Sequence, residues 1–311
     1  MRLVLLGVRG STPAPGAEFV RYGGHTSCVA VLADGAAVPS LVLDAGTGLR
    51  LLPGLLDGRP YRGTVVLSHL HWDHVQGFPF CPSVDHPEAR VDVLVPGPWD
   101  AAGNGVGDAP RLLLAGGMSP PNFPIGPEGL QGEWRFLPAR PGVRRLDGPV
   151  GGEPVATVTV APVAHKGGVT LGVRVELDGA VAAYLPDHTV CDPAETDPAA
   201  EALIRGVDVL LHDGQFTRRE VGLARAYGHS TIEDVLLLAD RCGVGRLVLT
   251  HHAPQRTDDE LDELAATFAR TPGGRPVSFA RQGDIVPVRP PATGVSAYAR
   301  SGSAEPEGEQ S

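Results

Sequence analysis

One short motif constrains this chain more strongly than any other part of its sequence. A β-branched run at residues 64–67 leads directly into the segment Ser68-His69-Leu70-His71-Trp72-Asp73-His74. Three imidazoles and one carboxylate on a tight turn after a strand suit divalent metals such as zinc. A histidine-rich surface loop is the alternative interpretation. Four side chains do not complete two metal sites, so a two-metal centre needs further ligands from elsewhere in the chain.

Three more residues with metal-binding side chains each follow a predicted strand. They are His165 after residues 155–163, Asp187 after residues 180–185 and His251 after residues 246–250. Taken alone, each is better explained as an ordinary polar residue at a strand end. Together they favour one site, because strand ends at one edge of a sheet can converge in space and a carboxylate can bridge two cations.

Strands and helices alternate in both halves of the chain, which indicates a layered α/β architecture. Strands are predicted over residues 2–8, 27–32, 41–43, 64–67, 91–95, 155–163, 170–177, 180–185, 207–211 and 246–250. Helices are predicted over residues 49–56, 194–205, 231–241 and 258–268, with Ser230 capping the third of them and Glu233 completing a capping box. Asp178-Gly179 predicts a hairpin turn.

Two segments fall outside this scheme. Residues 96–132 are rich in Gly and Pro, with one Leu-rich stretch, and predict a loop excursion beside the site. Residues 291–311 are too polar to bury a core and are predicted to be a disordered tail. Residues 1–290 are therefore expected to form one domain.

The charge of the chain argues against a large contact with nucleic acid. The formal net charge is −10, and the 26 basic residues, of which Lys166 is the only lysine, form no basic stripe.

The four cysteines are too few and too widely spaced for a disulfide framework or a CxxC metal site, so a reducing cytoplasm is expected. No apolar run approaches the roughly 20 residues that cross a bilayer.

Three further motifs carry a family resemblance: Gly7-Val8-Arg9-Gly10-Ser11, Tyr22-Gly23-Gly24-His25-Thr26-Ser27 and Asp44-Ala45-Gly46-Thr47-Gly48. With the histidine motif, they make the chain similar to the metallo-β-lactamase superfamily, in particular its branch of ribonuclease Z and small phosphodiesterases. The resemblance runs from residue 1 to about residue 289 and implies an αββα metallo-β-lactamase sandwich.

The same resemblance implies how the ligands are shared between two metals. One metal would be held by His69, His71 and His165, the other by Asp73, His74 and His251, with Asp187 bridging them. Asp44 would hold the ligand loop from behind. His252 is a rival for His251, which is preferred because the family places its ligand directly after the strand. Zinc is the expected metal, with manganese as the alternative, and His71 in place of a Glu argues against a redox di-iron site.

Two later elements resemble ribonuclease Z more closely. His212-Asp213 follows residues 207–211, and Gly228-His229-Ser230 precedes a helix. The resemblance implies that an acidic side chain, here Asp213, orients a proton-donating His229, although Asp is shorter than the usual Glu. Between His165 and Asp187, where ribonuclease Z has an arm that grips transfer RNA, this chain has one hairpin. Transfer RNA processing is therefore not expected, and His25, at a position more often occupied by Asn, is treated as a bystander.

These patterns predict a binuclear metal-dependent hydrolase that cleaves a small phosphodiester through a metal-held hydroxide. Asp73, Asp213 and His229 are predicted to be catalytic, with His229 protonating the leaving oxygen. An acyl hydrolase acting on a lactone, thioester or β-lactam is the alternative enzyme, and a metal-binding sensor or scaffold is the alternative without catalysis. The expected partner is a small molecule, with no long nucleic acid and no membrane. The oligomeric state is left open, a homodimer included.

Overall fold

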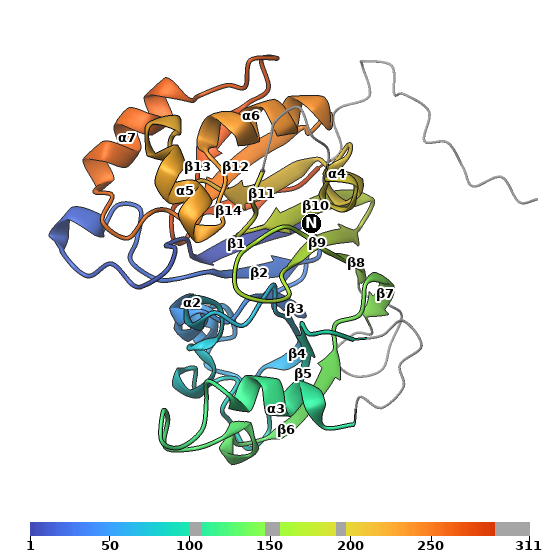
Figure 1. The fold of residues 1–311 in the computed structure, drawn as a ribbon. Helices are drawn as coiled ribbons and strands as arrows, with labels where there is room; N and C mark the ends of the chain where they lie inside the picture. The colour runs from blue at the N-terminus through green and yellow to red at the C-terminus, as the bar shows by residue number, and fades with distance from the viewer. Residues whose placement is uncertain (100–106, 147–155, 191–196, 290–311) are drawn as a thin grey trace, which may run out of the picture.

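Two seven-stranded sheets pack face to face and helices cover their outer faces, in a computed structural model that describes residues 1–99, 107–146, 156–190 and 197–289 (Figure 1). The first sheet has the order β14-β1-β2-β3-β4-β5-β6 and the second the order β13-β12-β11-β10-β9-β8-β7. In the first sheet β3 to β6 are parallel, and in the second β10 to β13 are parallel. The predicted αββα sandwich is confirmed.

The first sheet is built mostly from the first half of the chain. Its strands are β1 (Arg2–Gly7), β2 (Cys28–Leu32), β3 (Leu41–Leu43), β4 (Arg62–Val66), β5 (Arg90–Val95), β6 (Glu133–Pro138) and β14 (Ile285–Pro287). The second sheet contains β7 (Gly142–Leu146), β8 (Ala156–Pro162), β9 (Leu171–Leu177), β10 (Ala180–Leu185), β11 (Val209–Asp213), β12 (Arg246–Thr250) and β13 (Val277–Phe279). The last described strand, β14, pairs with the first strand, β1, and forms the edge of the first sheet.

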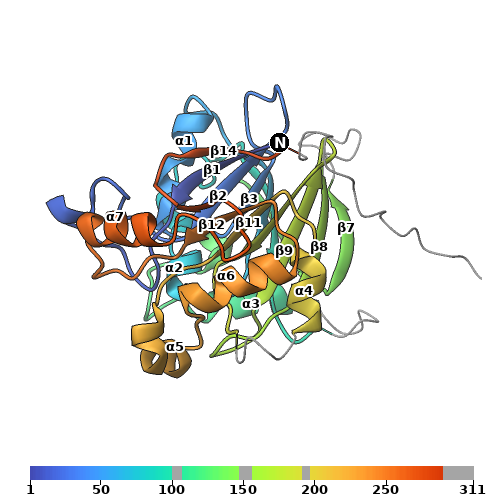
Figure 2. The same ribbon diagram turned by 90° about the horizontal axis from the view of Figure 1, so that it is seen from above.

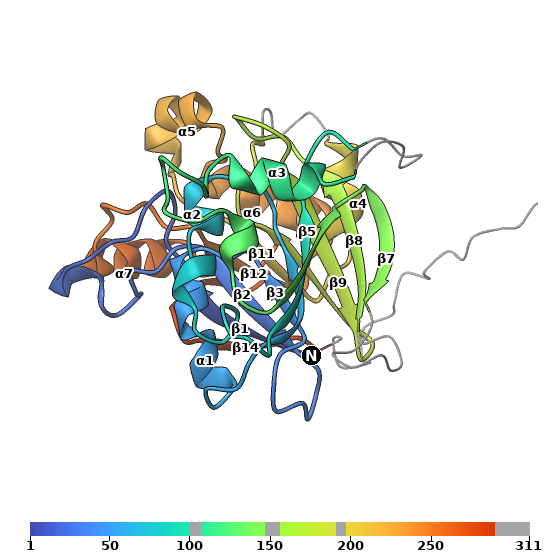
Figure 3. The ribbon, with the colours of Figure 1, turned by 90° about the horizontal axis from the view of Figure 1, so that it is seen from below.

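The helices divide between the two outer faces. Figure 3 shows α1 (Leu52–Leu55), α2 (Trp72–Val75) and α3 (Ala109–Ala115) on the side of the first sheet. Figure 2 shows α4 (Pro198–Ile204), α5 (Val221–Tyr227), α6 (Ile232–Arg241) and α7 (Asp258–Thr267) on the opposite side. One apolar core lies between the sheets, and a further core lies between each sheet and its helices. Burial of these three cores supplies the main driving force for folding.

Most predicted elements are present with boundaries shifted by one or two residues; the helix predicted over residues 194–205 is α4, which begins at Pro198, and residues 194–196 lie outside the described residues. The hairpin at Asp178-Gly179 is confirmed, since both residues have positive φ (54° and 72°), as a type I′ turn between β9 and β10 requires. Four strands that the sequence did not predict are β6, β7, β13 and β14, and three such helices are α2, α3 and α5. Helix α3 lies inside the predicted loop excursion, of which residues 100–106 are outside the described residues, as is the predicted tail 291–311.

The predicted cap of α6 is wrong. Thr231, not Ser230, is the N-cap, and its side chain accepts a hydrogen bond from the backbone N–H of Asp234. The Ser230 hydroxyl instead donates to the carbonyl of His188 (2.6 Å) and accepts from the N–H of Val190 (3.0 Å). Ser230 therefore ties the loop after β10 to the start of α6, and this tertiary contact outweighs the local capping preference.

The strand ends of the second sheet carry the predicted site residues to one edge. Since β10, β11 and β12 are neighbouring parallel strands, Asp187, Asp213 and His251 all lie at the carboxyl edge of this sheet. Within the described residues, no helix is long and apolar enough to cross a membrane.

Candidate metal centre

The ligand loop begins where β4 ends and continues into the single turn of α2. His69 and His71 precede the helix, and His74 lies on it. The Asp44 carboxylate, at a residue with a φ of 58°, accepts hydrogen bonds from the Ser68 backbone N–H (2.7 Å) and from His74 Nδ1 (2.7 Å). Asp44 thereby holds the loop from behind and leaves His74 Nε2 facing the cluster.

The structure brings all seven predicted ligands together in two adjoining groups. The ligand atoms lie within 4.8 Å of one another in the group His69, His71 and His165, and likewise in the group Asp73, His74 and His251. Asp187 lies between the groups. Its carboxylate oxygens are 2.9 Å from His74 Nε2, 3.4 Å from His251 Nε2, and 3.9 Å from the Nε2 atoms of His69 and His165.

The hydrogen bonding of this cluster fits a pair of divalent cations. The Nε2 atoms of His69 and His165 are buried without a hydrogen-bond partner. Such burial is costly unless something else binds these atoms. His165 Nδ1 donates to the carbonyl of Gly228 (2.6 Å), so its Nε2 carries the lone pair that a metal needs. Imidazoles with carboxylates are the donors that zinc prefers.

Electrostatics favour the ligating protonation states of His69 and Asp187, whereas at His74 the carboxylates of Asp73, Asp44 and Asp187 outweigh burial and raise the pKa well above its usual value. Burial, together with the neighbouring His74, lowers the pKa of His69 well below its usual value. Burial alone would raise the pKa of Asp187, but His251, His74 and His69 outweigh it and hold that pKa well below its usual value. Neutral imidazole and ionised carboxylate are the ligating forms.

His229 lines the same cleft as the ligands, and the buried Asp213 lies behind it. Asp213 ends β11, and His229 follows Gly228, whose φ of 83° ends α5 and turns the chain toward the cluster. His229 Nδ1 is 2.8 Å from Asp213 Oδ2 and 3.5 Å from Asp187 Oδ1. Burial lowers the pKa of His229, but the carboxylates, Asp213 first, outweigh it and raise the pKa to about 9. The shorter side chain of Asp therefore does reach the imidazole.

The adjacent histidines after β12 point to different places. His251, which has a φ of 57°, places Nε2 3.1 Å from Asp73 Oδ2. His252 turns away, with Nε2 2.9 Å from the carbonyl of Ala280 and its ring stacked on Phe279. The structure thus places His251, and not its rival, in the cluster.

The cluster opens into a cleft of about 710 Å³. Its walls include Ser11, Trp72, Gln215, Phe216, Leu223 and Tyr227 besides the residues of the cluster. None of the described side chains that line this cleft belongs to Lys or Arg. Among the described residues that line the cleft, only histidines, such as His229 with its raised pKa, can carry positive charge.

Sequence reasoning missed some residues of this site and set others aside. Ser11 donates its backbone N–H to Asp73 Oδ2 (2.8 Å), and the buried Tyr184 donates its hydroxyl to Asp44 (2.9 Å). Ser11 lies in a motif that carried the family resemblance, whereas nothing in its strand distinguishes Tyr184. Lys166 points away and donates to the carbonyl of Ala226 (2.8 Å).

Comparison with known proteins agrees with this geometry. Residues 40–252 match the family model described as the β-lactamase superfamily domain. The chain belongs to the β-lactamase superfamily, so the resemblance predicted from the sequence is confirmed.

The relatives include several proteins named ribonuclease Z. The one from Bradyrhizobium diazoefficiens is 28% identical over 268 residues, which cover 75% of this chain and 87% of the relative. The one from Exiguobacterium sp. is 34% identical over 95 residues, 30% of each chain. In four such relatives the match spans only 27% to 47% of the relative's length. A solved diphosphatase of the PhnP family shares the fold, with a TM-score of 0.61 at 19% identity over 92% of this chain and 97% of the other.

Proposed function

We propose that the chain is a phosphodiesterase that uses two divalent metal ions to hydrolyse a small phosphodiester. One observation carries the proposal: His229 lines the same cleft as residues of both ligand groups, and the fully buried Asp213 is hydrogen-bonded to it. The family membership and the relatives named ribonuclease Z support phosphodiester chemistry.

Each of the two groups of side chains is proposed to bind one of the two ions. His69, His71 and His165 would hold one ion and Asp73, His74 and His251 the other, with Asp187 placed between the two groups. When bound, two such ions supply Lewis acidity that neutralises the phosphoryl oxygens and lowers the pKa of water. Zinc fits this mixture of imidazole and carboxylate, with manganese as the alternative.

His229 supplies what the ions do not, a proton for the leaving oxygen. Its Nδ1 donates to Asp213, so its other nitrogen, Nε2, is free to donate into the cleft. Asp213 keeps the ring oriented and stabilises its charged form. Asp73 is proposed to act as a ligand that the Ser11 N–H holds in place.

A small substrate is favoured over a long nucleic acid. The whole interval between His165 and Asp187 contains only the hairpin of β9 and β10, with no room for a gripping arm. No Lys or Arg lines the cleft in the described residues, and the net charge of −10 opposes a long phosphate backbone. Processing of precursor transfer RNA is the rival that the names of the relatives support.

An acyl hydrolase and a sensor without catalysis would both use the same seven ligands. An acyl hydrolase needs less from a dedicated acid, because its leaving group is less basic than an alkoxide in thioesters and aryl esters. The buried Asp213–His229 pair therefore disfavours it. A sensor or scaffold without catalysis needs no proton donor at all.

A side-by-side rate screen tests these assignments. The metal-loaded protein is assayed on cyclic nucleotides, bis-aryl phosphates, precursor transfer RNA, lactones and thioesters. We expect small phosphodiesters to give the highest kcat/KM. Faster turnover of a lactone or thioester refutes the proposal, and no turnover of any substrate by protein that binds two metals supports a non-catalytic role.

A further inference from the structure

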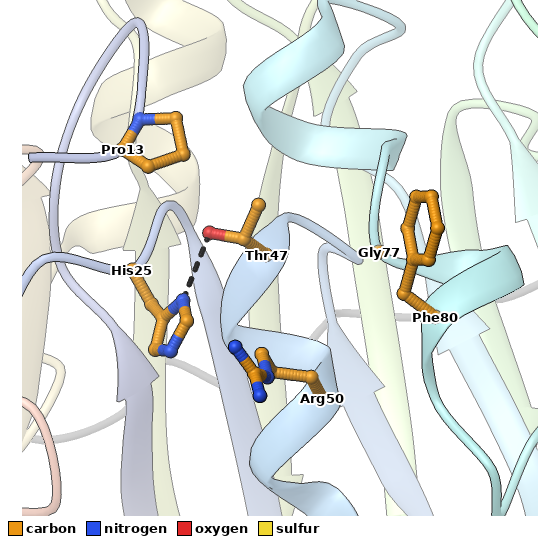
Figure 4. A pocket seen from close by; sticks show the side chains of 6 residues that line it. All are labelled: Pro13, His25, Thr47, Arg50, Gly77 and Phe80. Atoms are coloured by element: carbon orange, nitrogen blue, oxygen red, sulfur yellow. Dashed lines mark hydrogen bonds between the residues drawn. The ribbon is translucent and has the colours of Figure 1, made fainter. Parts of the chain in front are cut away.

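A second cavity lies outside the metal cleft and shares none of its lining residues. It measures about 470 Å³ and is lined by Pro13, His25, Thr47, Arg50, Gly77 and Phe80 (Figure 4). Ser11 lines the metal cleft and Pro13 lines this cavity, so the loop after β1 separates the two. The proposed phosphodiesterase reaction uses none of these six residues.

The polar side of this cavity is cationic. The exposed Arg50 side chain extends toward the ring of His25, whose Nδ1 lies 3.2 Å from Thr47 Oγ1 (Figure 4). Burial and the neighbouring Arg50 charge lower the pKa of His25. No Asp or Glu is among the lining residues, and Arg50 forms no ion pair with any described carboxylate. An arginine left unneutralised in a pocket of an acidic protein is suited to an oxyanion.

The other side of the cavity is apolar and flat. Phe80 is 62% exposed, so its face is available to a ligand, and an edge contact with Phe123 (5.8 Å between ring centroids) holds the ring in place. Pro13 adds a second apolar wall. The volume is in the range of roughly 300 to 1,000 Å³ that accommodates small organic ligands, and is much larger than a phosphate ion needs.

We propose that this cavity binds a small organic phosphate with a planar ring, of the kind that a nucleoside monophosphate represents. The phosphate group contacts Arg50, with Thr47 and His25 as hydrogen-bonding neighbours, and the ring packs on Phe80. A charge-assisted hydrogen bond fixes the anion, and ring stacking adds affinity without a strict requirement for one base.

Equilibrium dialysis of the metal-loaded protein with adenosine 5′-monophosphate tests the proposal, with inorganic phosphate and adenosine as separate probes. We expect Arg50→Gln to weaken binding of the nucleotide at this site by about tenfold or more, because the charge-assisted contact is lost. Phe80→Leu should weaken nucleotide binding and leave phosphate binding unchanged. The matched control is Arg59→Gln, which removes an exposed arginine that pairs with Asp57 on the same side of the sheet and should change neither.

Two further measurements separate this cavity from the metal cleft. Hydrolysis of a bis-nitrophenyl phosphate should be unchanged in Arg50→Gln. After a chelator has removed the metals, the protein should still bind the nucleotide, and Arg50→Gln should still weaken that binding. Circular dichroism checks that the chelated protein is folded. If the chelated protein unfolds, the proposal is tested by comparing nucleotide binding and hydrolysis between the metal-loaded wild-type protein and metal-loaded Arg50→Gln. Nucleotide binding that Arg50→Gln leaves unchanged overturns the proposal, as does a parallel loss of binding and hydrolysis. Equal affinity for phosphate and nucleotide overturns the proposal that the planar ring of the ligand packs on Phe80.

Discussion

Replacing His229 with Ala should slow the reaction by an amount that depends on the leaving group. A nitrophenolate departs without protonation, whereas a ribose alkoxide is too basic to leave readily, and general acid catalysis contributes about 10² to 10⁴-fold. We therefore expect His229→Ala to lower kcat by at least about 100-fold on an alkyl phosphodiester and by less than about tenfold on bis-nitrophenyl phosphate. Asp213→Ala should show the same pattern more weakly, because Asp213 acts through the imidazole, which it orients and whose charged form it stabilises.

The structure also predicts a cost in stability for this variant. Asp213 is fully buried, and without His229 it keeps only the backbone N–H groups of Gln215 (3.0 Å) and Ser230 (3.4 Å). A buried carboxylate that loses a partner costs about 1 to 3 kcal/mol or more of the free energy of unfolding. The kinetics should therefore be measured well below the Tm of the variant.

The assay compares kcat on both substrates with metal content measured on the same samples. His86→Ala is the matched control, because His86 does not line the cleft and its side chain accepts a hydrogen bond from the N–H of Glu88. Equal losses on the two substrates would show that His229 acts in binding or in structure. Loss of metal in the variant would make His229 a ligand and refute its role as the acid.

Three further predictions concern the metals, the substrate and the packing of the site. Elemental analysis should find about two zinc or manganese ions per chain, and Asp187→Ala should lower that number and abolish activity; a value near zero in wild-type protein that takes up none on titration would contradict the ligand set. Precursor transfer RNA should be cleaved far more slowly than the best small phosphodiester, and comparable rates with a steep salt dependence would show phosphate contacts that the cleft does not suggest. Gly10→Ala should displace His251 and lower metal content, because a Cβ at Gly10 would lie 2.4 Å from His251 Nδ1. The control Gly54→Ala, whose Cβ would meet nothing within 4 Å, should leave metal content and Tm nearly unchanged. A Gly10→Ala protein with full metal content would contradict this packing argument.

Local patterns in the sequence predicted much of the fold. Alternating strands and helices indicated the layered architecture, and Asp178-Gly179 predicted its hairpin, because strand propensity and turn chemistry act over a few residues. All four edge strands, β6, β7, β13 and β14, escaped prediction, and the last three are short. Each of these three is three to five residues long and pairs with a single neighbouring strand, which for β14 is the distant β1.

The candidate site divides in the same way. The sequence by itself determined that His69, His71, Asp73 and His74 lie together, because one strand end and one helical turn hold them, and the family resemblance supplied the partners from other strands. Only the tertiary structure decided between His251 and His252, since adjacent side chains diverge and the packing of Ala280 and Phe279 takes one of them away from the cluster. The tertiary structure likewise brought Asp213 within reach of His229. Distances between side chains on separate elements depend on how the whole chain packs, and that information is not present in any local segment.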